Sequence, residues 1–380
     1  MLRPIACLPG ERGESCLRTP LKFGSRSLAA AAGTVLLAQS FHPVMLGAVL
    51  AGQTGAWLAA LLSGVLASAA FWAVTASLRT LPGGDLMSLA RFTLGRPGAI
   101  GTSLLVAGVL VYHSGFVVRQ TAEMAVSAVY PLTPQTFAVV ALLACVLGGA
   151  YAGMNALVRL CRAFFPFLLL AILFIVLGVF GWGEVRNLLP LWGPGPGPLL
   201  VRSVMLLALY TPGLFLLMTA GQVQDPEGLW RAAAMAGIGS GTVYALALAM
   251  LIMTYTYPLA NSVAFPLHEM ARLILGGRFF QRVEGLWVLI WVWATVCHVG
   301  VVLHVAAAAI ADAFEMDTHR IAVPPLTAMV LTLAYFPVDQ AQAVDWHTAA
   351  APFGLLAGFA VPLLLSLIAM WQRRRKKRAA

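Results

Sequence analysis

Residues 157–181 read LVRLCRAFFPFLLLAILFIVLGVFG, with two arginines near the start and no charged residue after Arg162. About 20 apolar residues are enough for a helix to cross the hydrocarbon core of a bilayer. Arginine beside such a stretch marks its cytoplasmic end. The segment therefore predicts a transmembrane helix that enters the membrane from the cytoplasmic side.

The rest of the chain repeats this pattern. Of its 380 residues 60% are hydrophobic and only 10% are charged, whereas about 25% are charged in ordinary soluble domains. No stretch is left over for a soluble domain of the usual ~100 residues or more. We predict an all-α polytopic membrane protein with about ten transmembrane helices, at residues 28–50, 56–78, 98–124, 134–151, 157–181, 200–221, 232–257, 283–311, 321–337 and 348–371.

The basic residues predict how the chain lies in the membrane. With both termini in the cytoplasm, the inner segments carry 18 Lys and Arg and the outer segments carry 5, which follows the positive-inside rule. Much of the net charge of +10 lies in a basic tail at 1–27 and a second at 372–380. These tails suit anionic lipid rather than nucleic acid. The segment 28–371 then forms a single membrane domain, and the bilayer is its first partner.

Glycine and proline interrupt two of the predicted spans. The first contains Gly33, Thr34 and Val35, followed by Ser40 and His42-Pro43, and the sixth contains Tyr210-Thr211-Pro212-Gly213. Ten spans divide into two sets of five, and an odd-numbered set returns with inverted orientation. Transporters built in this way bind substrate where the first helix of each half is broken. Both interruptions can also be plain kinks, since Gly and Pro are common in membrane helices.

The other polar features of the sequence favour structural roles over roles in binding or catalysis. Arg119 and Glu123 stand four residues apart in the third span, which favours an ion pair near the membrane surface. The segment from Phe265 to Leu275 predicts a short amphipathic helix at the surface, and the run from Trp192 to Pro198 predicts a non-helical outer connector. No histidine, cysteine or carboxylate cluster predicts a metal site, and no catalytic or phosphate-binding motif predicts an enzyme or a cofactor.

Several short motifs, in a fixed order, resemble one membrane family. They are Arg119-Gln-Thr-Ala-Glu-Met124 with Leu132-Thr-Pro134, Gly153 with Arg159 and Phe165-Pro-Phe167, Asn187-Leu-Leu-Pro190, Phe265-Pro-Leu267 with Gly277 to Glu284 and Trp291, and Tyr335-Phe-Pro337 before a last span ending in Arg and Lys. The chain thereby resembles the spore germination permeases, the B subunits of nutrient germinant receptors, over residues 19–378. That family belongs with the amino-acid/polyamine/organocation transporters.

Two positions depart from the family pattern. The family's first span usually has Pro seven residues after Gly, whereas here Ser40 stands at that distance from Gly33 and Pro43 follows later. The family's sixth span often carries an acidic residue near its break, and this chain has none there. Relatives that bind an amino group through that acid therefore do not predict this ligand.

The resemblance implies two inverted five-helix repeats, broken first and sixth helices, and a pocket near the midplane walled by spans one, three, six and eight. It implies a nutrient such as an amino acid as ligand, an A subunit and a lipoprotein C subunit as partners, and the inner membrane of the spore as location. The expected substrate-binding residues are Gly33, Thr34, Val35, Tyr112, Tyr210, Thr211, Pro212, Gly213, Trp291 and His298.

Three functions stay open at this point. The chain can be a receptor subunit that senses a nutrient and triggers germination. It can be an amino-acid permease that carries solute by alternating access. It can also be a structural subunit whose pocket has degenerated, a reading that the missing acidic residue in the sixth span keeps open.

Overall fold

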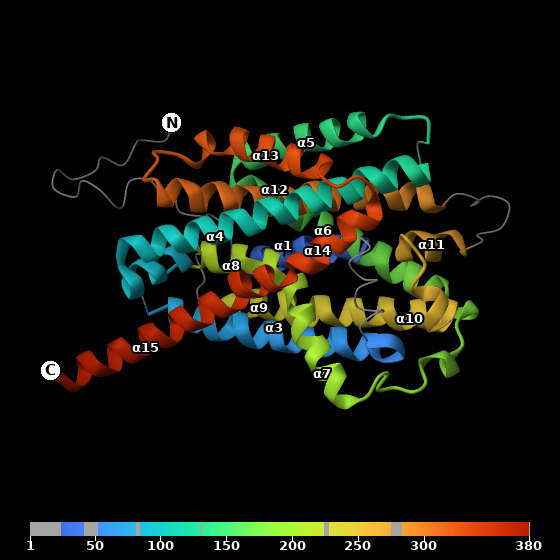
Figure 1. Cartoon of the computed structure of the whole chain (residues 1–380), viewed down its shortest axis with the longest axis horizontal. Helices are drawn as coiled ribbons and strands as arrows, with labels where there is room; N and C mark the ends of the chain where they lie inside the picture. Colours follow the sequence, from blue (N-terminus) through green and yellow to red (C-terminus); the bar gives the residue numbers. More distant parts are fainter. Residues whose placement is uncertain are drawn as a thin grey trace.

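The computed structural model describes residues 24–41, 52–80, 84–129, 131–223, 228–274 and 283–379, and every regular element in these ranges is a helix. Eight helices in them are long and apolar enough to cross a membrane. Most helices run along the long axis of the molecule (Figure 1). The predictions for the N-terminal tail up to residue 23, for His42-Pro43 and for Gly277 to Arg282 lie outside the described residues.

The first half of the chain supplies five of the predicted spans. Its third span is longer than the predicted 98–124, because the helix already begins at residue 86. The helix kinks at Gly95, whose φ is +72° and which lies two residues before Pro97. Asp85 caps this helix by accepting a hydrogen bond from the backbone N–H of Ser88 at 2.8 Å. The helices are α1 (Ser25–Leu37) with a 3-10 turn (Ala38–Phe41), α3 (Ala56–Leu78), α4 (Leu86–Met124), α5 (Gln135–Ala152) and α6 (Met154–Gly178).

The second half begins with the broken sixth span. Here a 3-10 segment (Leu206–Gly213) separates α7 (Pro196–Met205) from α8 (Leu214–Thr219). The later elements are α9 (Leu229–Ala234), a π-helical turn (Met235–Gly239), α10 (Ser240–Ala260), α11 (Pro266–Arg272), α12 (Val283–Ala313), α13 (Val323–Tyr335), α14 (Gln340–Leu355), a second π-helical turn (Leu356–Ala360) and α15 (Val361–Ala379).

The connector before the sixth span corrects one prediction. Residues from Pro196 to Pro198 were expected to be non-helical, but α7 begins at Pro196. Proline fits the first turn of a helix, because the N–H that it lacks would have no helical partner there. The bend lies earlier, at Gly193 (φ +53°), whose backbone packs so closely on Gly52 that a Cβ would lie 2.2 Å from its carbonyl oxygen.

Burial separates core helices from lipid-facing ones. In the most apolar window of α12, 78% of the residues are buried, against 28% for the corresponding windows of α5 and α6. On α6 the large side chains of Leu170, Phe174 and Leu177 are exposed. Apolar side chains on the outer surface are what a bilayer requires, so these helices cover the protein and α12 lies inside. It packs against α1, α4, α5 and α6.

The predicted pair of Arg119 and Glu123 is present, with Nε and Oε2 3.2 Å apart. Arg119 also donates to the carbonyl of Pro337 beyond α13, at 3.2 Å, and Glu123 accepts from Gln135 of α5, at 2.8 Å. The pair therefore ties the end of α4 to two neighbouring helices, in agreement with a structural role. The predicted short helix is present as α11, but five of its seven residues are buried, so it packs into the protein instead of lying on its surface.

Candidate functional site

The first break lies where α1 ends in the interior of the molecule. After Leu37 the backbone continues as a 3-10 turn, so carbonyl groups of the last helical residues lose their helical partners. Side chains from distant helices replace those partners. His298 of α12 contacts the Val35 carbonyl through Nδ1, Tyr244 of α10 donates to the Leu36 carbonyl, and the nearby Ser40 donates to that of Leu37.

The two breaks are joined directly. Gln39, in the 3-10 turn after α1, donates from Nε2 to the Leu209 carbonyl at 2.9 Å, and Leu209 lies in the 3-10 segment between α7 and α8. Gln39 is 3% exposed. A buried side-chain amide that bonds to a freed carbonyl fixes the relative position of the two interrupted helices.

A histidine pair extends the first break towards α4. Nε2 of His113 lies 2.9 Å from Nε2 of His298. A carbonyl oxygen can only accept, so the contact with Val35 places a hydrogen on Nδ1 of His298. In the neutral ring Nε2 then accepts, and His113 must donate. The two hydrogen bonds therefore run in one direction: His113 of α4 donates to His298 of α12, and His298 donates to the Val35 carbonyl near the end of α1.

The predicted residues of the first span occupy regular helix. Gly33, Thr34 and Val35 all lie within α1, and the break comes later, at residues 38–41. Gly33 serves close packing, since a Cβ there would lie 2.3 Å from the Phe165 ring. Thr34 donates to the Cys161 carbonyl of α6 at 3.0 Å. Among the three, Val35 reaches the site, through its carbonyl group.

The predicted residues of the sixth span lie within the break itself, because the 3-10 segment includes Tyr210, Thr211, Pro212 and Gly213. The Tyr210 hydroxyl lies against Gly64 of α3 and Gly241 of α10. The Thr211 side chain turns towards α14, where a Cβ on Gly354 would lie 3.0 Å from Oγ1. Thr211 is 3% exposed, and Oγ1 has no hydrogen-bond partner in the described part of the chain.

The other predicted residues lie on α4 and α12. Tyr112 is half-buried and faces His347 of α14 in a stacked arrangement, with ring centroids 6.4 Å apart. Trp291 is completely buried. It precedes His298 by seven residues, about two helical turns, and so shares its face of α12.

Three residues that the sequence analysis did not select belong to the same region. Gln39 and Tyr244 bond to freed carbonyl groups. Gln120 of α4 is completely buried, and within the described ranges neither atom of its amide has a hydrogen-bond partner. It follows His113 by seven residues, so the two share one helix face. Uncharged polar residues in apolar spans are a signal that could have identified all three.

Comparison with solved structures defines the class of protein. The fold is similar to that of Mhp1, a nucleobase-cation-symport-1 family transporter, in a closed conformation with bromovinylhydantoin bound; the TM-score is 0.64 at 14% identity, over 95% of this chain and 96% of that one. It is also similar to a Na+-coupled sialic acid symporter in a substrate-bound, outward-open state (TM-score 0.52, 11% identity, 92% and 78% coverage). The protein is thus a polytopic membrane protein with the inverted-repeat transporter fold.

The sequence comparisons then give the family. Residues 40–343 match the family described as spore germination protein, and the chain belongs to it. Spore germination protein YndE of Bacillus subtilis (strain 168) is 22% identical over 333 residues, which cover 84% of this chain and 88% of that protein. Spore germination protein A2 of the same organism is 23% identical over 282 residues, 71% and 74% of the two chains.

Proposed function

We propose that this protein is the nutrient-sensing membrane subunit of a germinant receptor, and that a small nutrient bound between the two helix breaks triggers germination. The observation that carries the proposal is the pair of breaks, joined by Gln39 and Leu209, in a chain of the spore germination family. The ligand class we propose is an amino acid. Its carboxylate would meet freed backbone amides and helix ends, which favour anions at their N-terminal side.

The site we propose combines the predicted residues with those found in the structure. Thr211 and Gln120 supply buried hydrogen-bonding atoms without a partner in the described residues. A ligand that carries both donors and acceptors can satisfy them. Of the predicted set, Tyr112, Tyr210, Pro212, Gly213 and Trp291 shape the walls, and Gly33, Thr34, Val35 and His298 set the position of the first break.

Sensing requires that ligand binding favour one conformation over another. We propose that the nutrient stabilises one relative position of α1 and α8, and that a membrane-embedded A subunit and a lipoprotein C subunit detect that position. The complex would lie in the inner membrane of the spore with both termini of this chain in the cytoplasm. No enzymatic step is part of the proposal.

The test is the thermal stability of the purified chain with amino acids, sugars and purine nucleosides. A ligand that binds only the folded state raises the apparent melting temperature by mass action. We expect a rise with at least one amino acid that is lost in Thr211→Val and kept in Thr211→Ser, which retains the hydroxyl. A folded chain that responds to no compound, alone or with its partner subunits, would contradict the proposal and favour the structural-subunit reading.

A second function, transport by alternating access, is favoured by the fold itself, because both solved structures compared above are transporters. The two functions differ in a measurable way. A permease reconstituted alone in liposomes accumulates the labelled ligand that stabilises it. A sensing subunit binds that ligand without accumulating it, and the germination response of spores then requires the partner subunits.

A further inference from the structure

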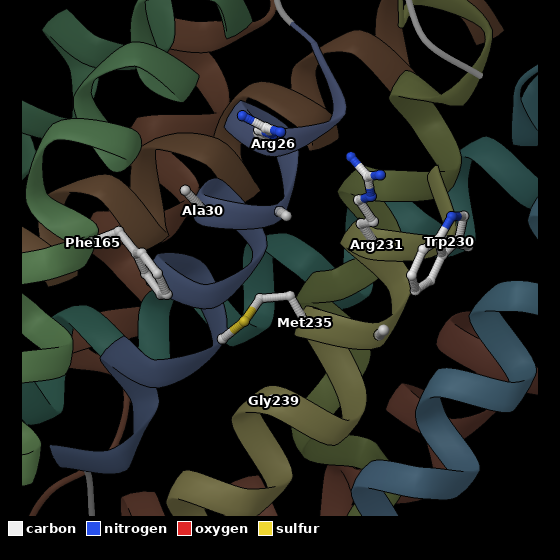
Figure 2. A pocket seen from close by; sticks show the side chains of 9 residues that line it. Arg26, Ala30, Phe165, Trp230, Arg231, Met235 and Gly239 are labelled. Carbon is white, nitrogen blue, oxygen red and sulfur yellow. The ribbon is translucent and has the colours of Figure 1, made fainter. Parts of the chain in front are cut away.

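A groove lies beside α1, on the side of the molecule where this helix begins. Its volume is about 450 Å³, which is within the usual range for ligand sites. Figure 2 shows that α1, α6 and the α9–α10 region form its sides, with Arg26 and Arg231 towards one end and Gly239 at the other. The lining residues are Arg26, Ala29, Ala30, Phe165, Trp230, Arg231, Ala234, Met235 and Gly239.

The lining has two chemical parts. Apart from the two arginines, all of the side chains are apolar or aromatic. Both arginines are exposed, and neither forms an ion pair with any residue that the structure describes. Arg231 lies over the ring of Trp230, with its guanidinium carbon 5.7 Å from the ring centroid. The groove therefore matches a ligand with a negatively charged end and a long apolar body.

The exposed side chains around the groove indicate whether such a ligand would enter from the lipid or from water. The side chain of Trp230, which lines the groove, is 52% exposed. The neighbouring helix α6 exposes the large apolar side chains of Leu170, Phe174 and Leu177. Trp is enriched at the boundary between lipid headgroups and acyl chains. The groove thus opens towards lipid rather than towards water.

We propose that this groove binds an anionic phospholipid. The phosphate lies between Arg26 and Arg231, and one acyl chain lies against Phe165, Trp230 and Met235. Arginine recognises phosphate through directed hydrogen bonds as well as charge. The arginine-rich end of the groove is also the end that the charge distribution assigns to the cytoplasm, where anionic headgroups gather. Binding of the phospholipid in this groove does not require that a nutrient be bound elsewhere.

The acyl chain would act by packing on α1, the helix that leads into the first break. Phe165 and Met235 lie directly over Gly33, because a Cβ built there would be 2.3 Å from the Phe165 ring and 3.1 Å from the Met235 methyl group. A chain in the groove covers these two side chains from the lipid side. It therefore supports α1 against α6, and loss of the lipid should lower the melting temperature of the protein.

The experiment titrates the purified full chain with dioleoyl phosphatidylglycerol and counts bound lipid by native mass spectrometry. The double variant Arg26→Gln/Arg231→Gln should weaken binding about 25-fold, since each basic residue near an anionic surface contributes about fivefold. The matched control Arg159→Gln/Arg374→Gln removes two exposed arginines of the same predicted side outside the groove. It should change the affinity less than twofold.

Three further arms identify the occupant. Ala234→Trp keeps both arginines but fills the groove, and should also weaken lipid binding. Inorganic phosphate at the same concentrations should give no stabilisation, and phosphatidylcholine should bind at least tenfold more weakly than phosphatidylglycerol. Equal loss in the groove and control variants, or equal binding of the two lipids, would overturn the proposal. A groove that takes up no lipid but binds an amphipathic helix of a partner subunit would overturn it as well.

Discussion

The breaks in the first and sixth spans have the same backbone form but differ in how completely their polar groups are hydrogen-bonded. Each replaces α-helix by a 3-10 stretch inside an apolar span. At the first break, His298, Tyr244 and Ser40 contact three successive carbonyl groups. At the sixth, the buried hydroxyl of Thr211 has no partner among the described residues.

If the proposed function holds, this difference separates a structural break from one that binds a ligand. A buried polar group without a partner costs about 1–3 kcal/mol, and apolar surroundings in a membrane offer no water to relieve it. The first break avoids this cost by using side chains from α10 and α12. The sixth bears the cost at Thr211, and Gln120 of α4 bears a similar cost. A ligand with donors and acceptors removes both.

The largest expected effect comes from His298→Leu. This change removes the contact with the Val35 carbonyl and the partner of His113 at once. Two buried groups lose their hydrogen bonds, so the free energy of unfolding should fall by about 2–5 kcal/mol. The apparent melting temperature of the purified chain measures it. The control is Thr332→Val, which removes an exposed bond on α13. A variant as stable as this control would show that the first break does not need its partner on α12.

The next effect comes from the bridge between the breaks. Gln39→Leu leaves the Leu209 carbonyl without its donor, and should lower stability by about 1–3 kcal/mol. Because the bond joins α1 to the 3-10 segment, we also expect faster proteolysis or hydrogen exchange at both breaks. Exchange that rises in α1 alone would show that the two interrupted helices move independently.

The sequence predicted the spans better than it predicted their contacts. Apolar runs and arginine positions determine where a helix crosses a bilayer, and both are local properties. The break of the first span was expected at Gly33 and lies at Ala38–Phe41, because glycine there serves close packing with Phe165. That reason depends on a residue 132 positions away in the chain.

The residues around the two breaks were predicted in part for the same reason. Pro212 and Gly213 mark the sixth break correctly, since they disrupt helical bonding in any surroundings. Of the two paired histidines the sequence marked only His298, because the contact with His113 arises from the packing of α4 on α12. Tyr244 and Gln120 fit only the general pattern of uncharged polar residues in apolar spans, which does not say what each side chain contacts. Only the folded structure shows that Tyr244 meets a freed carbonyl and that Gln120 meets none.

A smaller effect is expected from Tyr244→Phe. The ring and its edge-to-face contact with Tyr210 remain, while the donor to the Leu36 carbonyl is lost. One missing hydrogen bond to a buried acceptor should lower stability by about 1–2 kcal/mol. Combining this change with His298→Leu tests whether the first break is one unit, because contacts that share a helix end are not additive. Strict additivity of the two losses would mean that each carbonyl is stabilised separately.

The smallest effect on stability, and the sharpest contrast with the first break, is expected at Thr211. Valine has nearly the shape of threonine without the hydroxyl, and that hydroxyl has no partner in the described chain. Thr211→Val should therefore leave the melting temperature unchanged or raise it by the equivalent of up to about 1 kcal/mol, while ligand-induced stabilisation disappears. Thr211→Ser should keep the ligand response. If Thr211→Val instead lowers stability as His298→Leu does, the hydroxyl has a structural partner, and the sixth break is stabilised in the same way as the first.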